Sequence, residues 1–164
     1  MIDDKNELFV VVDEKDNIIE YRTRYDCHHD KQLIHRAVGV VIINDKGEIL
    51  LQKRSKHKDT DPGKYDVAVS GHVGKGESYE ACAEREMKEE IGVSTELAFV
   101  RKMLVRFPDE TEYDAIFRAT HNGPFKINTD EIDEITFATE DEIKNNMFNL
   151  TTFARKALQP TGIL

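Results

Sequence analysis

The sequence lacks the features that mark membrane-spanning and secreted proteins. Its longest apolar run, "AVGVVII" at residues 37–43, is too short to cross a bilayer. The N-terminal segment "MIDDKNE" is acidic and polar, which argues against a signal peptide. Cys27 and Cys82 are the only cysteines, and without a secretory signal we interpret them as reduced thiols. We therefore predict a cytoplasmic protein without a membrane partner.

Positive charge is also scarce. The chain has 23 Lys and Arg residues against 32 Asp and Glu residues, a net charge of −9. A surface this negative repels the phosphates of nucleic acids, so we expect no nucleic-acid partner. The 164 residues, 39% of them apolar, suit one globular domain, and the chain has no repeat and no low-complexity segment.

The apolar pattern predicts a mixed α/β fold. "LFVVVD" and "NIIEYRT" predict an N-terminal β-hairpin, and "AVGVVIIN" and "EILLQKRS" predict a second one. Between the hairpins we predict an irregular polar link, "YDCHHDKQLIHR", and after them a loop, "KHKDTDPGK". We then expect a strand at "YDVAVSGHV", three later strands and two C-terminal helices, and we expect residues 1–33 to extend the same domain as residues 34–164. The later strands are "ELAFVRKMLVRF", "EYDAIFRAT" and "EIDEITFAT", and the helices are "TEDEIKNNMF" and "LTTFARKAL".

The stretch "GHVGKGESYEACAEREMKEEIGV", residues 71–93, predicts a glycine-rich loop followed by a helix that Ser78 caps and Gly92 ends. At about 100° per residue, Glu90 lies about 40° from Glu86, and Glu89 lies about 60° away on the other side. The three carboxylates thus share a face that continues into an apolar stripe, which predicts an inward-facing acidic cluster. Carboxylates held together in this way need a cation, and carboxylate oxygens suit Mg²⁺ or Mn²⁺.

The same stretch resembles the Nudix box, G-x5-E-x7-R-E-U-x-E-E-x-G-U, in which U is a bulky aliphatic residue. All nine fixed positions match, namely Gly71, Glu77, Arg85, Glu86, Met87, Glu89, Glu90, Gly92 and Val93. The resemblance implies an α/β/α sandwich and metal-dependent hydrolysis of a nucleoside diphosphate linked to another moiety. It implies metal ligands at Glu86, Glu89 and Glu90, and it implies that Arg85 and Glu77 hold the loop against the helix.

The mechanism implied is attack of water on a phosphorus of the diphosphate, with metal ions neutralising phosphate oxygens. The identity of the general base stays open: Glu86 is one candidate, and the others are Glu110, Glu112, Glu131 and Asp109.

Candidate contacts to a small-molecule phosphate substrate are Arg36, Arg54, Lys58, Gly71 and His72. Three aromatic residues could stack on a nucleotide base or belong to the core, namely Tyr65, Phe107 and Phe117.

A second resemblance is to the branch of this superfamily that contains isopentenyl-diphosphate isomerase. It rests on the extended N-terminus and on "LIHRAVGVVIINDKGEILLQKRS", "PGKYDVAVSGHV" and "GES". It implies a second metal site, with candidate ligands His28, His35, His72, Glu110 and Glu112.

Two departures count against isomerisation. Ser70-Gly71-His72 stands where the isomerase pattern has Cys-Gly-His, and a serine hydroxyl titrates far from a thiol's pKa of about 8.5. The acidic set "REMKEE" is also intact. A third interpretation, a Nudix module that binds a nucleotide without cutting it, ranks last because no acidic residue of the box is missing. A homodimer is a further expectation.

Overall fold

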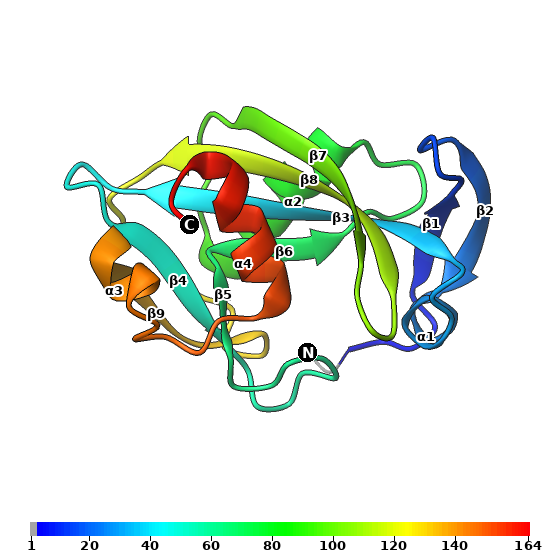
Figure 1. Ribbon diagram of the computed structural model, residues 1–164, viewed down its shortest axis with the longest axis horizontal. Coiled ribbons are helices and arrows are strands. Elements are labelled where there is room, and N and C mark those ends of the chain that lie inside the picture. Colours follow the sequence, from blue (N-terminus) through cyan, green and yellow to red (C-terminus); the bar gives the residue numbers. More distant parts are fainter. Residues whose placement is uncertain (1–2) are drawn as a thin grey trace.

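The computed structural model describes residues 3–164, which form a nine-stranded mixed sheet with helices on both faces (Figure 1). The helices are α1 (Arg24–His29), α2 (Tyr79–Ile91), α3 (Glu140–Lys144) and α4 (Thr152–Leu158), followed by the 3-10 helix η1 (Gln159–Thr161). The strands are β1 (Leu8–Val12), β2 (Ile18–Thr23), β3 (Ile34–Ile43), β4 (Ile49–Arg54), β5 (Tyr65–Val67), β6 (Val69–His72), β7 (Ala98–Arg106), β8 (Thr111–Thr120) and β9 (Ile132–Ala138). The predicted α/β/α sandwich is confirmed.

The long strand β3 is the centre of the sheet. It runs parallel to β8 over ten residue pairs and antiparallel to β1, β4 and β6. Its side chains alternate between the faces: Val38, Val40 and Ile42 pack with α2, and Val41 packs with the cluster that includes α3 and α4. Each fully buried aliphatic side chain of this kind stabilises the fold by about 1.5–3 kcal/mol. The two-sided burial explains why β3 reads as a continuous apolar run.

The N-terminal hairpin is confirmed and is joined to the rest of the sheet. β1 pairs antiparallel with β2 and, at Val11 and Val12, with β3 (Figure 1). The turn of the hairpin is tied down by Asp16, whose carboxylate accepts hydrogen bonds from Arg36 and Tyr79 and from Lys102. The extension therefore packs against the strands and the helix that carry the box.

Three local predictions are wrong in detail. The segment predicted as an irregular link contains most of α1. This helix begins after Thr23, whose hydroxyl accepts a hydrogen bond from the Asp26 backbone. A helix of six residues is too short to show a helical period in the sequence. "YDVAVSGHV" forms two short strands instead of one, because β5 pairs with β4 while β6 pairs with β3. The helix predicted within residues 139–148 is confined to Glu140–Lys144.

Helix α2 begins and ends where the sequence predicts. The Ser78 hydroxyl accepts a hydrogen bond from the Ala81 backbone, and such a cap stabilises a helix by about 1 kcal/mol. Gly92 adopts a left-handed conformation, with φ of 68°, and its N–H donates to the Lys88 carbonyl. These ends fix the register of the glutamates on the helix. Among residues 3–164, no helix is long and apolar enough to cross a membrane.

Candidate active site

The glycine-rich loop and α2 are joined by an ion pair between Arg85 and Glu77. Arg85 Nε lies 2.6 Å from Glu77 Oε2 and Arg85 Nη2 lies 2.9 Å from Glu77 Oε1. Glu77 Oε1 also accepts a hydrogen bond from the Gly74 backbone at 2.9 Å. Arg85 also contacts two later residues of the helix, Glu86 at 2.8 Å and Glu89 at 3.2 Å. The geometry matches the expectation that this pair holds the loop against the helix.

The three glutamates of α2 that belong to the predicted acidic cluster lie at different depths. Glu90 is buried, Glu86 is partly buried and the Glu89 side chain is 57% exposed at the rim of the cavity. The prediction of three inward-facing carboxylates is therefore wrong for Glu89. The Glu90 Oε1 atom accepts a hydrogen bond from Gln52 at 3.2 Å, while its Oε2 atom is buried without a hydrogen-bond partner among residues 3–164.

Burial dominates the electrostatics of these carboxyl groups. It raises the pKa of Glu86 to about 7 in spite of the positive charge of Arg85. Burial, followed by the negative charge of Glu86, raises the pKa of Glu90 well above its usual value. Both shifts follow chiefly from burial, and the negative charges of neighbouring carboxylates add to them. An unpartnered buried oxygen in a carboxylate pair is the donor chemistry that Mg²⁺ and Mn²⁺ prefer, so these residues fit such an ion.

Gly71 is required by the approach of Glu86. A Cβ atom at position 71 would lie 2.4 Å from Cδ and 2.5 Å from Cγ of Glu86, far inside van der Waals contact. The glycine at the head of the box therefore lets the glutamate side chain pass against the β6 backbone.

The five residues of the predicted second metal site come together at the other end of the cavity. Potential ligand atoms of the three histidines lie within 4.8 Å of one another, and so do those of His35, Glu110 and Glu112. His28 Nε2 is 3.0 Å from Glu110 Oε2, and His35 Nε2 is 3.7 Å from Glu112 Oε1. Both ring nitrogens of His35 are buried without a hydrogen-bond partner among the described residues. Imidazole and carboxylate donors with free lone pairs fit a divalent ion.

The charges in this second cluster are unevenly balanced. Burial lowers the pKa of His35 to about 3, so its ring is neutral and its nitrogens are available as donors. Burial also acts on Glu110, but its hydrogen bond and attraction to His28 outweigh it and lower the pKa to about 2. Glu112 is different: burial raises its pKa well above the usual value, and the negative charge of Asp114 adds to the rise. Asp114 is completely buried, and the sequence did not indicate that its charge acts on Glu112.

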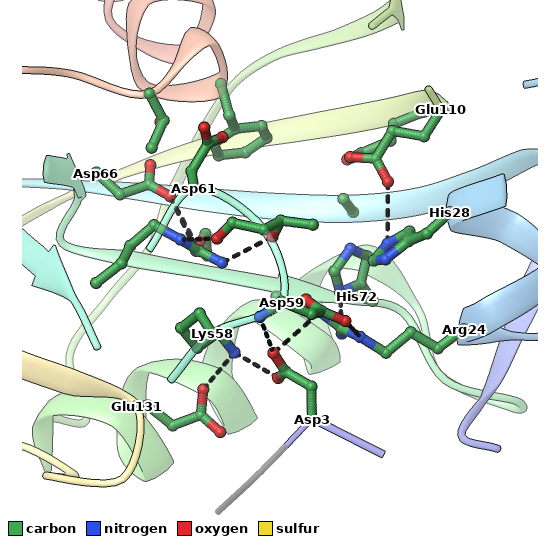
Figure 2. A pocket seen from close by; sticks show the side chains of 18 of the residues that line it. Asp3, Arg24, His28, Lys58, Asp59, Asp61, Asp66, His72, Glu110 and Glu131 are labelled. Carbon is green, nitrogen blue, oxygen red and sulfur yellow. Dashed lines mark hydrogen bonds and ion pairs between the residues drawn. The ribbon is translucent and has the colours of Figure 1, made fainter. Parts of the chain in front are cut away.

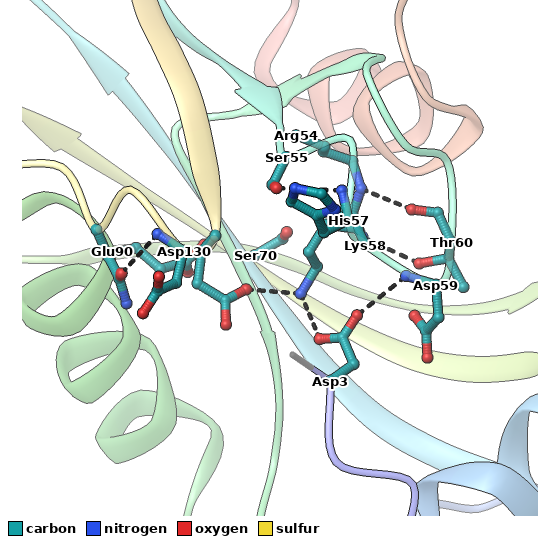
Figure 3. A network of polar contacts seen from close by, with 12 residues as sticks. Asp3, Arg54, Ser55, His57, Lys58, Asp59, Thr60, Ser70, Glu90 and Asp130 are labelled. Carbon is teal, nitrogen blue, oxygen red and sulfur yellow. Dashed lines mark hydrogen bonds and ion pairs between the residues drawn. The ribbon is translucent and has the colours of Figure 1, made fainter. Parts of the chain in front are cut away.

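One cavity of about 880 Å³ is lined by the three α2 glutamates of the box and by His28, His72, Glu110 and Glu112 of the second cluster, while His35 is buried and does not line it. Figure 2 shows His28 and Glu110 on one side and Asp66 on the other, with Lys58 between Asp3 and Glu131. Lys58 Nζ lies 2.6 Å from carboxylate oxygens of both Asp3 and Glu131, and Figure 3 also shows its contact with Asp3. The cavity therefore carries basic residues among many carboxylates, and these bases are paired with acids of the chain itself.

Arg24 is a basic residue of the cavity that sequence reasoning missed. Its side chain is only 6% exposed, and its guanidinium makes two hydrogen bonds to Asp59, at 3.0 and 2.8 Å. A third nitrogen lies 3.4 Å from His72 Nδ1. Arg24 falls between the predicted strand at residues 17–23 and the predicted link at residues 25–36, so no pattern in the sequence singled it out. The signal that points to it is burial of an arginine in a short helix, which only the folded structure reveals.

Other predicted substrate contacts separate by position. Arg54, Lys58, Gly71 and His72 line the cavity. Arg54 is held by Thr60, which accepts two of its hydrogen bonds, at 3.0 and 2.9 Å. Arg36 does not line this cavity: it pairs with Asp16 at 2.9 Å and stacks on Tyr79, so its position does not support a role in binding substrate.

Of the candidate general bases and aromatic residues, some line the cavity and others lie in the core. Phe107, Asp109, Glu110, Glu112 and Glu131 line the cavity. Phe117 belongs to the core beside α2, and Tyr65 packs with the core on the opposite face.

Ser70 lies on the cavity wall. Its hydroxyl donates a hydrogen bond to the buried carboxylate of Asp66, at 3.3 Å, and the Asp66 carboxylate also accepts one from the Val67 backbone. Burial raises the pKa of Asp66, while the charge of Arg54 and the hydrogen bonds from Val67 and Ser70 act in the opposite direction. No thiol lines the cavity: Cys27 and Cys82 are buried in separate apolar clusters.

An α/β/α sandwich with a loop-and-helix carboxylate site defines a class of phosphate-processing enzymes, and comparison with known proteins gives the family. The sequence model of the NUDIX domain matches residues 33–159. The chain belongs to the Nudix family. It is 34% identical over 150 residues to an uncharacterized Nudix hydrolase of Yersinia pestis, covering 90% of this chain and 81% of that protein. Its relatives in this family are named as enzymes, which agrees with the prediction of a Nudix enzyme.

Two further relatives carry more specific names. The chain is 34% identical over 134 residues to isopentenyl-diphosphate Delta-isomerase 2 of Photorhabdus laumondii, covering 79% of this chain and 75% of that protein. It is 41% identical over 106 residues to the prenyl-diphosphate phosphatase of Methanosarcina mazei, covering 65% and 61%. Among solved structures, DR0079 from Deinococcus radiodurans has a TM-score of 0.80 at 20% identity, covering 93% of this chain and 98% of that one. That likeness shows the fold.

Proposed function

We propose that the protein is a metal-dependent hydrolase that cleaves the diphosphate bond of a nucleoside diphosphate linked to another moiety. The observation that carries this proposal is Glu90, a buried carboxylate with an unpartnered oxygen beside Glu86 at the cavity wall. Leaving such a group buried costs free energy unless a cation joins it. Glu86, Glu89 and Glu90 would hold Mg²⁺ or Mn²⁺. When bound, such an ion neutralises phosphate oxygens and lowers the pKa of water.

The chain's own residues have separate tasks. Arg85 and Glu77 fix the glycine loop, and Gly71 leaves room for Glu86. Lys58, Arg54 and Arg24 are the cavity's candidate phosphate contacts. In the structure Asp3 is paired with Lys58, and Asp59 is paired with Arg24. Carboxylate oxygens resemble phosphate oxygens as partners of a guanidinium or an ammonium group. We expect the diphosphate to displace these acids.

Among the open candidates for the general base, Glu131 has the most suitable position. It lines the cavity and its negative charge acts on both Glu86 and Glu90, raising the pKa of each. Lys58 holds its carboxylate at 2.6 Å. Glu110 and Glu112 are instead engaged with the histidines. Glu131 would take the proton of the attacking water.

The second candidate function is chemistry on a prenyl diphosphate, with His28, His35, His72, Glu110 and Glu112 holding a second ion. The unpartnered ring nitrogens of that cluster favour it, as do the names of two relatives. Ser70 argues against isomerisation, because its hydroxyl donates to Asp66 and cannot replace a thiol in moving protons at carbon. A prenyl diphosphate would therefore be hydrolysed.

A substrate panel tests the proposal. Nucleotide sugars, dinucleotides, nucleoside triphosphates and isopentenyl diphosphate are incubated with Mg²⁺ and, separately, with Mn²⁺, and the products are identified by phosphorus NMR. We expect metal-dependent cleavage of a diphosphate bond, with ¹⁸O from labelled water in one phosphate product. Isomerisation of isopentenyl diphosphate without hydrolysis of any compound would overturn the proposal.

A further inference from the structure

Phe9 has an unusual set of neighbours. It lies on β1, is completely buried, and its ring contacts all three histidines of the second cluster. The ring centroids are 4.4 Å apart for His72, 5.3 Å for His35 and 5.7 Å for His28. The first two pairs are stacked, with interplanar angles of 15° and 26°, while His28 meets Phe9 edge-on at 63°. One apolar ring therefore supports three imidazoles that come from α1, β3 and β6.

His28 is paired with Glu110 and His72 lies beside Arg24, but the ring of His35 has no such partner. A histidine that binds a metal ion is usually oriented by a hydrogen bond from its second ring nitrogen to a neighbouring acceptor. Both ring nitrogens of His35 are buried without such a partner among residues 3–164. The orientation of the His35 ring therefore depends on packing, and Phe9 is stacked against it.

We propose that Phe9 is a positioning residue for a metal ion held by His28, His35 and His72, because its ring fixes the orientation of their imidazoles. This inference rests on the second metal site named under the proposed function. It adds a residue that donates nothing to the ion and acts through the ligands. The electron-rich face of Phe9 also favours the stacked rings when metal binding makes them more positive.

The position of Phe9 is itself well fixed. β1 pairs with β2 on one side and with β3 on the other, and Phe9 forms a bridge with Gly74 of the glycine-rich loop. Cys27 and Val11 pack around it in a small apolar cluster. Phe9 lies outside residues 33–159, the part that matches the family. The N-terminal hairpin thus supplies a support for histidines, two of which belong to the family domain.

The experiment measures metal affinity directly, on the full chain without substrate. Co²⁺ is titrated in the presence of excess Mg²⁺, so that the α2 glutamates are occupied and the visible absorption bands of Co²⁺ report binding at the histidines. Phe9→Leu and Phe9→Ala are compared with wild type. The matched control is Val10→Ala: Val10 is the next residue of β1, is equally buried, and packs into the core beside α2 instead of against the histidines.

We expect Phe9→Leu to bind Co²⁺ about 10-fold or more weakly and with altered absorption bands, as for loss of other residues that orient metal ligands. Val10→Ala should melt at a lower temperature and bind Co²⁺ as wild type does. Unchanged affinity and bands in Phe9→Leu would overturn the inference, and this variant decides the matter even if Phe9→Ala does not fold. Absence of histidine-type bands in wild type would also overturn it. Neither result touches Mg²⁺-dependent hydrolysis at the α2 glutamates, which the substrate panel tests separately.

Discussion

Arg85 and Glu77 form a two-pronged ion pair, with nitrogen–oxygen distances of 2.6 and 2.9 Å, that ties the middle of α2 to the glycine-rich loop. We predict that Arg85→Ala lowers both stability and turnover. The Arg85 side chain is 35% exposed, so the lost ion pair should cost only about 1 kcal/mol in the free energy of unfolding. Because the ion pair holds the glycine-rich loop in place, we expect turnover to fall more than stability. Melting temperature and kcat, measured on the same preparation, check both effects.

Lys88→Ala is the control for this change, because Lys88 is an exposed residue on the same helix. Its substitution should leave turnover unchanged. A fall in turnover by Arg85→Ala at an unchanged melting temperature would mean that Arg85 contacts phosphate directly instead of holding the loop.

The second prediction concerns Glu90→Gln. The change removes one ligand charge and keeps the side-chain size and the acceptor oxygen that Gln52 contacts. We expect hydrolysis to be abolished while the metal-free variant melts no lower than metal-free wild type, since repulsion with Glu86 is relieved. Glu84→Gln, at an exposed position of the helix, should be active. Near-normal turnover of Glu90→Gln at saturating Mg²⁺ would contradict the metal assignment.

The third prediction is a pH dependence that appears in the presence of EDTA. Burial raises the pKa of Glu86 from its ordinary value of 4.5 to about 7. The folded state therefore holds a proton that the unfolded state releases between these pH values, and stability falls as pH rises through this window. Below pH 4.5 the group is protonated in both states, so its contribution is then fully present.

Glu86→Gln isolates this effect because glutamine stays neutral. The melting temperature of Glu86→Gln minus that of wild type should increase between about pH 4.5 and about pH 7 in EDTA. Excess Mg²⁺ should raise the wild-type melting temperature most at the upper end of the range. A difference that does not vary with pH would show that Glu86 is not held in this environment.

The acidic helix was predictable because its signals are local. Ser78, Gly92 and the spacing of Glu86 and Glu90 all lie within one turn-loop-helix segment, so helical geometry relates them directly. The exposure of Glu89 was not predictable. An angle of about 60° on a helical wheel does not tell whether a side chain reaches the cavity floor or its rim, since that depends on the loop packed beside it.

The histidine cluster could be proposed from sequence only through resemblance. Its members come from α1, β3, β6, the β7–β8 turn and β8, and no local period connects such positions. Phe9 and Arg24 gave no signal, because an apolar residue in a strand and an arginine near a turn are ordinary. Arg36 is the opposite case: it was predicted to contact substrate, but its side chain pairs with Asp16 on the N-terminal hairpin. The positions of Phe9, Arg24 and Arg36 all depend on tertiary contacts, which the sequence pattern does not show.

The fourth prediction uses the contact between Gly71 and Glu86. A Cβ atom at position 71 would meet Glu86 carbons at 2.4 and 2.5 Å, so the glutamate side chain must move away. Gly71→Ala should lower kcat by about 10-fold or more and reduce the rise in melting temperature that Mg²⁺ produces, as for other losses of ligand orientation. Gly47→Ala is the control. Its φ of 77° makes alanine strained by about 1–2 kcal/mol, yet its Cβ would meet nothing within 4 Å, so the variant should be less stable and fully active.

The last prediction separates hydrolysis from isomerisation through Ser70. In a hydrolase the Ser70 hydroxyl only donates to Asp66, so Ser70→Ala should retain most hydrolysis. Ser70→Cys restores the Cys-Gly-His sequence of the isomerase pattern beside His28 and Glu110. We expect this variant still to fail with isopentenyl diphosphate, because the pocket is shaped for another substrate. Proton exchange at the allylic carbon, followed by NMR in deuterated water, measures the reaction. Exchange by wild type would contradict the hydrolase proposal, whereas exchange by Ser70→Cys alone would show that the histidine cluster supports isomerisation and that the serine had prevented it.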